Sequence, residues 1–344
     1  MNSREIVTAA IEFTGPERIP YSIDIDIIRF RLERSPDDVQ EIEKLMEEAP
    51  TDFVTLWHAP FKEWRSVGGP EARRVDEWGV TWHQNNAVAH PLEADWKLLD
   101  DYSFPDPHKP GRFDHVITEI EQNEERYLLG TVWYTLFERM WTLRGFENML
   151  TDPYLNYDRF VFLREKLLDF DMEILKQWLE IGVDGIFFSD DWGWQSGLLM
   201  NPDDWRELYK PCYKKLFDMA HQGGAHVWMH SCGHVTEIIP DLIEIGLDVL
   251  NPVQPQAMEV NELGNRFGGE LCFHGGVDVQ GTLPRGTAED VDSEVKHLIK
   301  TFGCFGGGYI GGTSHTILPD TPLENIRALF EAFERYSKRQ ASDL

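Results

Sequence analysis

The chain alternates between short, almost continuously apolar segments and longer stretches in which apolar residues recur every three or four positions. The short segments have the length and composition of buried strands, and the longer stretches have the spacing of helices with one apolar face. Strand and helix therefore follow each other in regular order along the chain. The predicted strands are 18–25, 52–57, 127–133, 185–191, the HVWMH segment that ends at His230, 248–253, 271–278 and 308–313.

Eight strands, each followed by a helical stretch, predict a (β/α)8 TIM barrel of the α/β class. Their apolar residues lie on both faces, which is typical of parallel strands in a covered sheet. The pattern VDEWGVTWHQN within 73–86 predicts a hairpin inserted after the second strand. The segment 92–112, rich in proline and aspartate, is interpreted as a long surface loop. No change of composition follows it, so residues 1–344 are expected to form a single domain.

The surface is expected to be strongly acidic, because 32 Lys and Arg are set against 60 Asp and Glu, a formal net charge of -28. Such a surface repels phosphate backbones and anionic lipids, which argues against a nucleic acid or a membrane as partner. No apolar run approaches the roughly eighteen residues of a spanning helix. The N-terminal segment is charged and amphipathic, unlike a signal peptide. The four cysteines are scattered, which favours reduced thiols and a cytoplasmic location.

The segment His230-Ser231-Cys232 lies at the end of the HVWMH strand. Side chains alternate between the two faces of a strand, so the imidazole of His230 and the thiol of Cys232 point the same way. Both groups bind zinc well, and this pair at a strand end indicates part of a zinc site. Taken alone, the same residues equally allow a buried core histidine beside an inert thiol.

In a (β/α)8 barrel the catalytic groups lie at the carboxyl ends of the strands. Polar residues occupy that position in most of the predicted strands and form the candidate site. The candidate catalytic residues are Asp190, Asp191, Glu138 and His274, and the candidate substrate-binding residues are Asp24, Asn251 and Gln254. Trp192 and Trp194, on the loop directly after Asp191, are expected to form an aromatic or apolar wall for substrate.

The third zinc ligand is expected to be His315, at the end of the last strand, with a role as general acid or base as the alternative. Asp190 or Asp191 could instead supply an oxygen ligand, or could orient a ligating imidazole. For His274 two roles stay open, holding substrate or packing against a tryptophan.

The block from 184 to 332 resembles the uroporphyrinogen decarboxylase superfamily. The resemblance is carried by the segments DGIFFSDDWG, NPDDWRELYKPCYKKLF, HSCGHVTEIIPDLIEIGLDVLNPVQ, HGGVDVQGTLPRGT and GGTSHTILPDTPLENIRALFEAF. It implies a (β/α)8 barrel, in agreement with the strand count. The superfamily comprises cofactor-free decarboxylases of uroporphyrinogen and zinc-dependent methyltransferases that work with cobalamin-type corrinoids.

The true decarboxylases carry an R-Q-A-G-R stretch near the N-terminus that grips substrate carboxylates, whereas this chain has IPYSIDIDIIRFRLERS in that region. Arg29, Arg31 and Arg34 are present, but the motif and its glycine are absent. A tyrosine and a serine of the decarboxylase site correspond here to Glu138 and Asp190. These added carboxylates would repel a polyanionic porphyrinogen. The late histidine of the decarboxylases does match, at His315.

The methyltransferase branch carries H-x-C on the fifth strand and a cysteine after the eighth. His230 and Cys232 match, and His315 stands where the branch has its cysteine. The resemblance implies a zinc-dependent methyltransferase or demethylase with these three residues as ligands. It would move a methyl group between a small methylated substrate, such as a methoxy compound, and a corrinoid or thiol acceptor. The implied cofactors are zinc and a corrinoid, carried by a partner protein that docks over the barrel mouth.

Two alternative functions stay open at this point. One is a metal-free decarboxylase of a tetrapyrrole or a smaller carboxylate, and the other is a non-catalytic protein that binds a corrinoid or tetrapyrrole. Methoxylated aromatics, methylated amines, methanol and thiol acceptors are all compatible with the sequence. The residues leave the oligomeric state open, although members of the superfamily are often homodimers.

Overall fold

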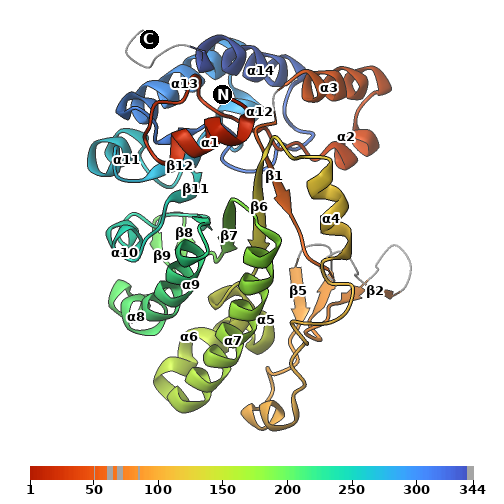
Figure 1. Ribbon diagram of the computed structural model, residues 1–344. Helices are drawn as coiled ribbons and strands as arrows, with labels where there is room; N and C mark the ends of the chain where they lie inside the picture. The colour runs from red at the N-terminus through yellow and green to blue at the C-terminus, as the bar shows by residue number, and fades with distance from the viewer. Residues whose placement is uncertain (50, 60–64, 68–72, 84–85, 339–344) are drawn as a thin grey trace.

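The computed structural model describes residues 1–49, 51–59, 65–67, 73–83 and 86–338. Its centre is a seven-stranded sheet in the order β1-β6-β7-β10-β11-β12-β13, in which every neighbouring pair is parallel. Helices surround this sheet (Figure 1), so the (β/α)8 barrel predicted from the sequence is confirmed. The strands are β1 (Phe53–Leu56), β6 (Tyr127–Val132), β7 (Gly185–Ser189), β10 (His226–His230), β11 (Val249–Val253), β12 (Cys272–Gly275) and β13 (Tyr309–Ile310).

The covering helices bury one face each, as their sequence spacing predicts. In the last helix, for example, Ile326, Leu329 and Phe333 are buried at intervals of three and four residues. The helices are α1 (Ser3–Ile11), α2 (Ile27–Glu33), α3 (Pro36–Glu48), α4 (Asp114–Glu121), α5 (Phe137–Arg144), α6 (Phe146–Leu155), α7 (Tyr157–Ile181), α8 (Pro202–Leu208), α9 (Lys210–Gln222), α10 (Ile239–Glu244), α11 (Val260–Phe267), α12 (Thr282–Arg285), α13 (Ala288–Phe302) and α14 (Leu323–Ser337). Two 3-10 helices, η1 (Trp96–Asp101) and η2 (Gly303–Phe305), and the short strands β8 (Gly193–Trp194) and β9 (Gly197–Leu198) complete the connections.

The amino-terminal end of the barrel is closed by α1. The backbone N–H of Arg4 donates to the carbonyl of Glu125, just before β6, and the N–H of Gly308 donates to the carbonyl of Ala10, just before β13. The apolar face of α1 joins a buried cluster with side chains from the strands, including Phe187 and Trp228. Because this end is filled, a cavity inside the barrel can open only at the carboxyl ends of the strands.

The predicted first strand, 18–25, is where the structure departs from the expectation. This segment forms no regular strand and meets the last strand through isolated parallel bridges, the first between Tyr21 and Gly311. On its other side, the backbone N–H of Tyr21 donates to the carboxylate of Asp52 over 3.1 Å. A proline within the segment has no N–H to give to a ladder, which limits regular pairing. The barrel is therefore closed by bridges and one side chain, at the seam between β13 and β1.

An antiparallel sheet of four strands is inserted between β1 and α4, with the strands β2 (Arg65–Val67), β3 (Arg73–Val75), β4 (Thr81–His83) and β5 (Asn86–Ala89). The predicted hairpin within 73–86 is confirmed as the pair β3 and β4, apart from 84–85, which lie outside the described residues. The insertion packs on the barrel through Arg139. Its guanidinium lies 4.7 Å from the centre of the Trp78 ring and 3.6 Å from the carboxylate of Asp76.

The segment 92–112, predicted as a surface loop, is partly packed into the protein. It contains η1, and both Leu92 and Leu99 are buried. Arg112 at its end is also buried and pairs with Glu77 of the insertion over 3.0 Å. The surface-loop prediction was wrong at these positions. Contacts between distant segments, such as the ion pair of Arg112 and Glu77, leave no periodic pattern in the sequence.

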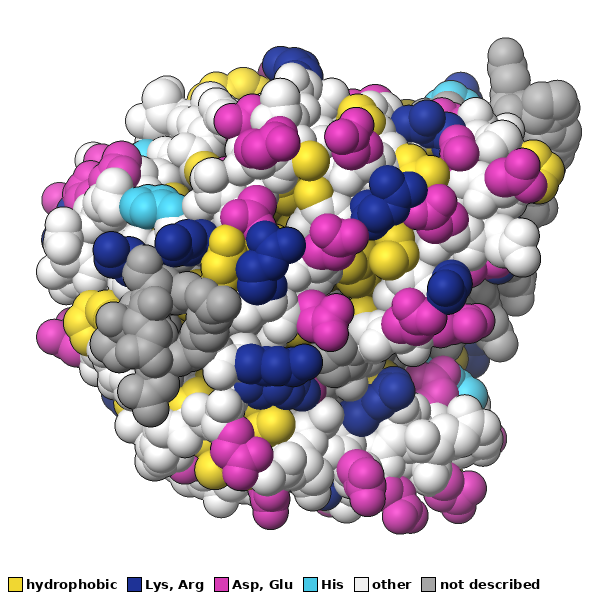
Figure 2. All heavy atoms as spheres, turned by 90° about the horizontal axis from the view of Figure 1, so that it is seen from above, with side chains coloured by type: hydrophobic (Ala, Val, Ile, Leu, Met, Phe, Trp, Pro, Cys, Tyr) yellow, Lys and Arg dark blue, Asp and Glu magenta, His cyan; other side chains and the backbone are white. Residues whose placement is uncertain are grey.

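Within the described part of the chain, no helix is both long enough and apolar enough to cross a membrane. Figure 2 views the molecule from the side on which α1 and α14 lie, and acidic and basic side chains are interspersed over that face. The excess of acidic residues is thus not gathered there into one strong field.

The closure of the barrel should depend on Asp52, whose carboxylate is fully buried. It accepts hydrogen bonds from the hydroxyl of Ser3 over 2.8 Å and from both terminal nitrogens of Arg18 over 2.7 and 2.5 Å, besides the N–H of Tyr21. We expect Asp52→Asn to lower the free energy of unfolding by about 3 kcal/mol, because it leaves the Arg18 guanidinium without its counter-charge. Urea denaturation measured by tryptophan fluorescence would check this value.

A matched control is Glu33→Gln, which removes the exposed ion pair between Arg29 and Glu33. Exposed pairs contribute little, so this change should cost less than about 0.5 kcal/mol. Equal losses for the two variants would contradict the role given to Asp52.

Candidate active site

His230 and Cys232 lie together at the carboxyl end of β10, and a carboxylate joins them. The Nε2 atom of His230 is 3.5 Å from the Sγ of Cys232 and 3.7 Å from an oxygen of Asp191. One ligand atom from each of the three residues lies within 4.8 Å of the other two. This cluster could hold a metal ion, since imidazole nitrogen, thiolate sulfur and carboxylate oxygen are all ligands of divalent transition metals.

Asn251 of β11 fixes the orientation of His230. Its Oδ1 accepts a hydrogen bond from Nδ1 of His230 over 2.7 Å. That bond uses the Nδ1–H, so the lone pair is on Nε2, the atom that faces Cys232 and Asp191. Gln254, just after β11, accepts from the N–H of Gly233 over 2.6 Å, and its amide nitrogen is 3.5 Å from the Cys232 sulfur. Asn251 and Gln254, both predicted to bind substrate, thus contact His230 and Cys232 of the candidate metal site.

The position of Asp191 depends on a close crossing of two loops. Its carboxylate accepts a hydrogen bond from the backbone N–H of Cys232 over 2.7 Å. A Cβ on Gly193 would lie 2.5 Å from the carbonyl oxygen of Cys232, and Gly233 has a φ of +81°. Only glycine fits at either position without displacing backbone. The two glycines therefore allow the loop after β7 to bring Asp191 against the loop after β10.

The cluster carries an excess of negative charge. Burial raises the pKa of the Cys232 thiol, and the nearby carboxylates of Asp191 and Glu138 raise it further. Deprotonating this thiol would place another anion beside the carboxylates. A bound cation would reverse that penalty, which is the electrostatic condition of a metal site.

Asp190, predicted as a catalytic group, is fully buried and faces the start of α5. Its carboxylate accepts from the backbone N–H groups of Leu136, Phe137 and Glu138 over 3.1, 2.8 and 2.7 Å, and from the hydroxyl of Tyr213. Burial raises its pKa to about 6 in spite of these bonds. All of these contacts are with protein groups, so its placement is that of a helix cap that holds Glu138.

Glu138, in the first turn of α5, is buried and accepts a hydrogen bond from the hydroxyl of Ser189 over 2.9 Å. Burial raises its pKa well above the ordinary value, and the charges of Asp191 and Asp190 act in the same direction. A raised pKa favours the protonated form of this carboxyl group, which is the form that a general acid requires.

His315, predicted as the third metal ligand, is not part of the cluster. Its ring centre is 6.4 Å from that of His230, and its Nδ1 accepts from the backbone N–H of Thr316 over 2.8 Å. Asp24 lies beside it and accepts from the hydroxyl of Thr316. The third candidate metal ligand in this arrangement is Asp191, and His315 was predicted for that role.

A cavity of about 580 Å³ opens next to the cluster, and each strand of the central sheet, or the residues just after it, contributes to its lining. Its lining includes four aromatic side chains and several polar ones: Phe53, Trp57, Trp133, Phe187, Asp24, His230, Asn251, His274, Thr313, Ser314 and His315. His274 accepts a hydrogen bond from the Asn251 amide over 2.8 Å, and burial lowers its pKa to about 3, so its ring is neutral. Its ring also packs edge-on against Trp228, which is one of the two roles that the sequence left open, and the role in holding substrate stays a prediction.

The two tryptophans predicted to wall the substrate site do not line this cavity. Trp192 is fully buried against Trp205 and Tyr213, and Trp194 is 67% exposed. The cavity is walled instead by Trp57 and Trp133, which the sequence reasoning missed. Both end predicted strands, and following the strand alternation to the carboxyl ends would have pointed to them.

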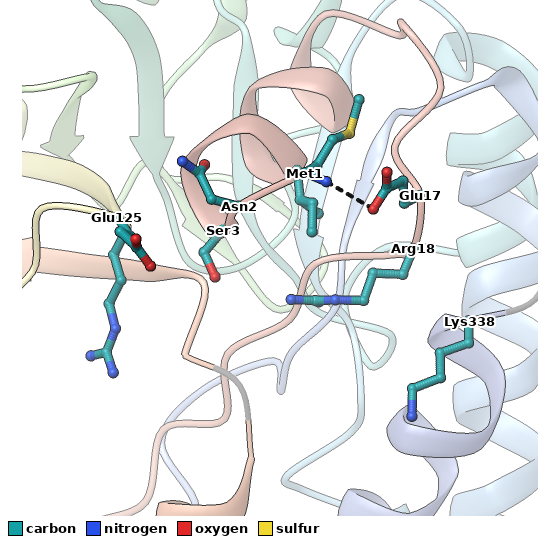
Figure 3. A pocket seen from close by; sticks show the side chains of 9 residues that line it. Met1, Asn2, Ser3, Glu17, Arg18, Glu125 and Lys338 are labelled. Atoms are coloured by element: carbon teal, nitrogen blue, oxygen red, sulfur yellow. Dashed lines mark hydrogen bonds and ion pairs between the residues drawn. The ribbon is translucent and has the colours of Figure 1, made fainter.

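A second hollow, of about 500 Å³, lies at the opposite end of the barrel near the start of α1. Figure 3 shows its polar lining, in which the N-terminal ammonium pairs with Glu17 over 3.0 Å. Arg18, also in this lining, is bound to the carboxylate of Asp52. The N-terminal ammonium and Arg18 thus already have acidic partners. The hollow is also remote from the strand ends that carry catalytic groups in such barrels.

The sequence of this chain matches a known protein family. The family model described as uroporphyrinogen decarboxylase (URO-D) matches residues 84–336. The chain is 27% identical over 158 residues to methylcobamide:CoM methyltransferase MtaA of Methanosarcina barkeri, covering 46% of this chain and 43% of that protein. It is 28% identical over 179 residues to uroporphyrinogen decarboxylase of Thermus thermophilus, covering 50% of this chain and 47% of that protein.

Among solved structures, a methyltransferase from Methanosarcina mazei superposes with a TM-score of 0.71 at 17% sequence identity, covering 98% of this chain and 99% of that one. This similarity shows the fold. The matches to the two curated relatives each span less than half of the relative's length. The family model nevertheless covers most of the chain, from the end of the inserted sheet to the last helix, and the chain belongs to the uroporphyrinogen decarboxylase family.

Proposed function

We propose that this protein is a zinc-dependent methyltransferase that moves a methyl group from a small methylated substrate to a corrinoid or thiol acceptor. The observation that carries the proposal is the cluster of Asp191, His230 and Cys232 beside the cavity. The proposal is supported by the similarity to a relative whose name specifies methyl transfer from a methylcobamide.

Asp191, His230 and Cys232 would hold the zinc, and His230 also lines the cavity. Their donor set of oxygen, nitrogen and sulfur fits zinc, and the negative charge of the cluster favours a divalent cation. When bound, zinc supplies a Lewis acid that stabilises negative charge on a coordinated oxygen or sulfur atom. His315 lines the cavity instead and can contact substrate there.

The side chains around the cluster would control the proton and the orientation of the substrate. In the transfer, the lone pair of the acceptor forms the new bond to the methyl carbon. The pair of the broken bond stays on the leaving oxygen or sulfur. Glu138 would protonate that atom as general acid, because burial and the neighbouring carboxylates raise the pKa of its carboxyl group. Asp190 keeps Glu138 in place through the hydrogen bonds to the start of α5.

In the proposed reaction, the acceptor would be the cobalt of a corrinoid on a partner protein that docks over the barrel mouth. The whole chain, 1–344, would act as one catalytic unit, and its scattered reduced thiols favour the cytoplasm.

Decarboxylation of a porphyrinogen is disfavoured by the positions of the arginines. Arg29 pairs with Glu33, Arg31 pairs with Glu43, and Arg34 donates to backbone carbonyls near 320. Among the described residues that line the cavity there is no Lys or Arg. A substrate with many carboxylates would find no counter-charge in that lining.

Zinc content separates the ligand set proposed here from the one that the sequence suggested. We expect Cys232→Ser and Asp191→Asn each to weaken zinc binding by about 100-fold or more, because each removes a ligand. His315→Ala should retain zinc. Metal analysis after dialysis against a chelator would measure this, with the exposed Cys304→Ser as the matched control. Loss of zinc from His315→Ala with retention in Asp191→Asn would reverse the assignment.

Zinc affinity should rise with pH. The pKa of the Cys232 thiol is raised, so the thiol is protonated at neutral pH and must lose its proton to bind metal. One released proton corresponds to about a tenfold gain in affinity per pH unit below that pKa. Competition with a chromophoric chelator between pH 6.5 and 8 would measure the slope. An affinity independent of pH would exclude the thiol as a ligand.

Glu138→Gln should slow methyl transfer by about 100-fold at unchanged zinc content, because the amide keeps the shape of the side chain but cannot donate an acidic proton. The assay is the conversion of cob(I)alamin to methylcobalamin with methyl ethers, methyl thioethers and methylated amines as donors, followed by absorbance. Glu180→Gln, on the exposed face of α7, serves as the control. Consumption of uroporphyrinogen by metal-free protein would overturn the proposed function.

A further inference from the structure

One wall of the cavity is continuous and aromatic. Trp57 follows β1, Trp133 follows β6 and Phe187 belongs to β7, and these three strands are neighbours in the sheet. The ring centres of Trp57 and Trp133 are 5.0 Å apart, and those of Trp133 and Phe187 are 5.6 Å apart. Trp133 also lies 5.2 Å from the ring of His230. The aromatic wall therefore extends to His230 of the candidate metal site.

The opposite wall is polar and carries no positive charge among the described residues. It comes from the other side of the seam, where the strands β11 to β13 and the segment before α2 supply Asn251, His274, Ser314, His315 and Asp24. The ring of His274 is neutral because its pKa is lowered. The carboxylate of Asp24 is the charged group of this wall and accepts a hydrogen bond from Thr316. Among the described lining residues, an anionic ligand would thus meet a carboxylate and no Lys or Arg side chain.

We propose that this cavity binds an uncharged, benzene-sized ring that carries an O-methyl group. The planes of Trp57 and Trp133 are inclined at 61° and those of Trp133 and Phe187 at 75°. The ligand ring therefore contacts the three side chains at different angles, and its oxygen-bearing edge points toward His230, whose Nε2 lies 3.5 Å from the Cys232 sulfur. The volume of about 580 Å³ accommodates such a ring with its substituents, since pockets for small organic ligands range from about 300 to 1,000 Å³. The role given to the O-methyl group rests on the proposed methyl transfer, whereas the preference for a neutral ring rests on the lining alone.

A quaternary ammonium ion is the main competing ligand, because aromatic rings also attract cations. Recognition of such an ion uses rings that surround it on several sides. Here the rings come from three neighbouring strands and form a single wall, and the facing wall is built of amide, hydroxyl and imidazole groups. A flat ring with oxygen substituents matches both walls at once, and this favours the neutral aromatic ligand.

Isothermal titration calorimetry on the full-length protein tests the inference with three probes. They are 1,2-dimethoxybenzene, its carboxylated analogue 3,4-dimethoxybenzoate, and tetramethylammonium. We expect the neutral ring to bind about tenfold or more tightly than either ion, the size of effect that one lost aromatic contact or one uncompensated charge produces. Trp133→Leu should weaken that binding about tenfold, whereas Trp194→Leu, which changes an exposed tryptophan outside the cavity, should not.

Phe187→Leu is the second variant, in case the loss of Trp133 disturbs His230, and it should weaken binding of the neutral ring in the same direction. Tighter binding of the benzoate or of tetramethylammonium would overturn the inference, and so would the absence of binding of the neutral ring. The titrations are run with and without added zinc and require no turnover. Binding of the neutral ring without methyl transfer would uphold the inference while the proposed function fails.

Discussion

The closed barrel depends on how the segment 18–25 is held between the last strand and β1. Two bridges secure one side, and the buried carboxylate of Asp52 secures the other by binding both the backbone of Tyr21 and the guanidinium of Arg18. The segments on the two sides of this seam also contribute to the cavity, which is lined by Asp24 from the segment 18–25 and by Phe53 from β1. The closure of the barrel therefore places both side chains in the lining.

The second constraint is the crowding of acidic groups at the end of β7. Asp190, Asp191 and Glu138 lie near one another and near a thiol, and so many anions cannot share one buried space. Each of the three carboxyl groups is stabilised in a different way. Asp190 is compensated by backbone N–H groups and a tyrosine hydroxyl, and the pKa of Glu138 is raised, which favours its uncharged form. Asp191 accepts one N–H and faces the ligand atoms of His230 and Cys232, which leaves a cation as its natural partner.

The relatives of this chain include a methyltransferase and a decarboxylase, and the charges in its own cavity bear on which chemistry it supports. A fold of this kind supports many reactions because the strand ends can carry different side chains. In this chain the arginines near the N-terminus are paired with glutamates or backbone carbonyls on the outer helices. The cavity retains carboxylate, imidazole and aromatic groups, which suit a metal ion and a neutral substrate better than a polyanion.

The sequence by itself determined the order of strands and helices, the inserted hairpin and the pairing of His230 with Cys232 on one face. These features depend on periodicity within a few residues, which the chain displays directly. Only the tertiary structure decided that Asp191 joins that pair and that Asp190 caps α5. The first depends on the crossing of two loops at Gly193 and Gly233, and the second on the contact between the end of β7 and the start of α5. Both contacts join residues about forty to fifty positions apart, without any local pattern in the sequence.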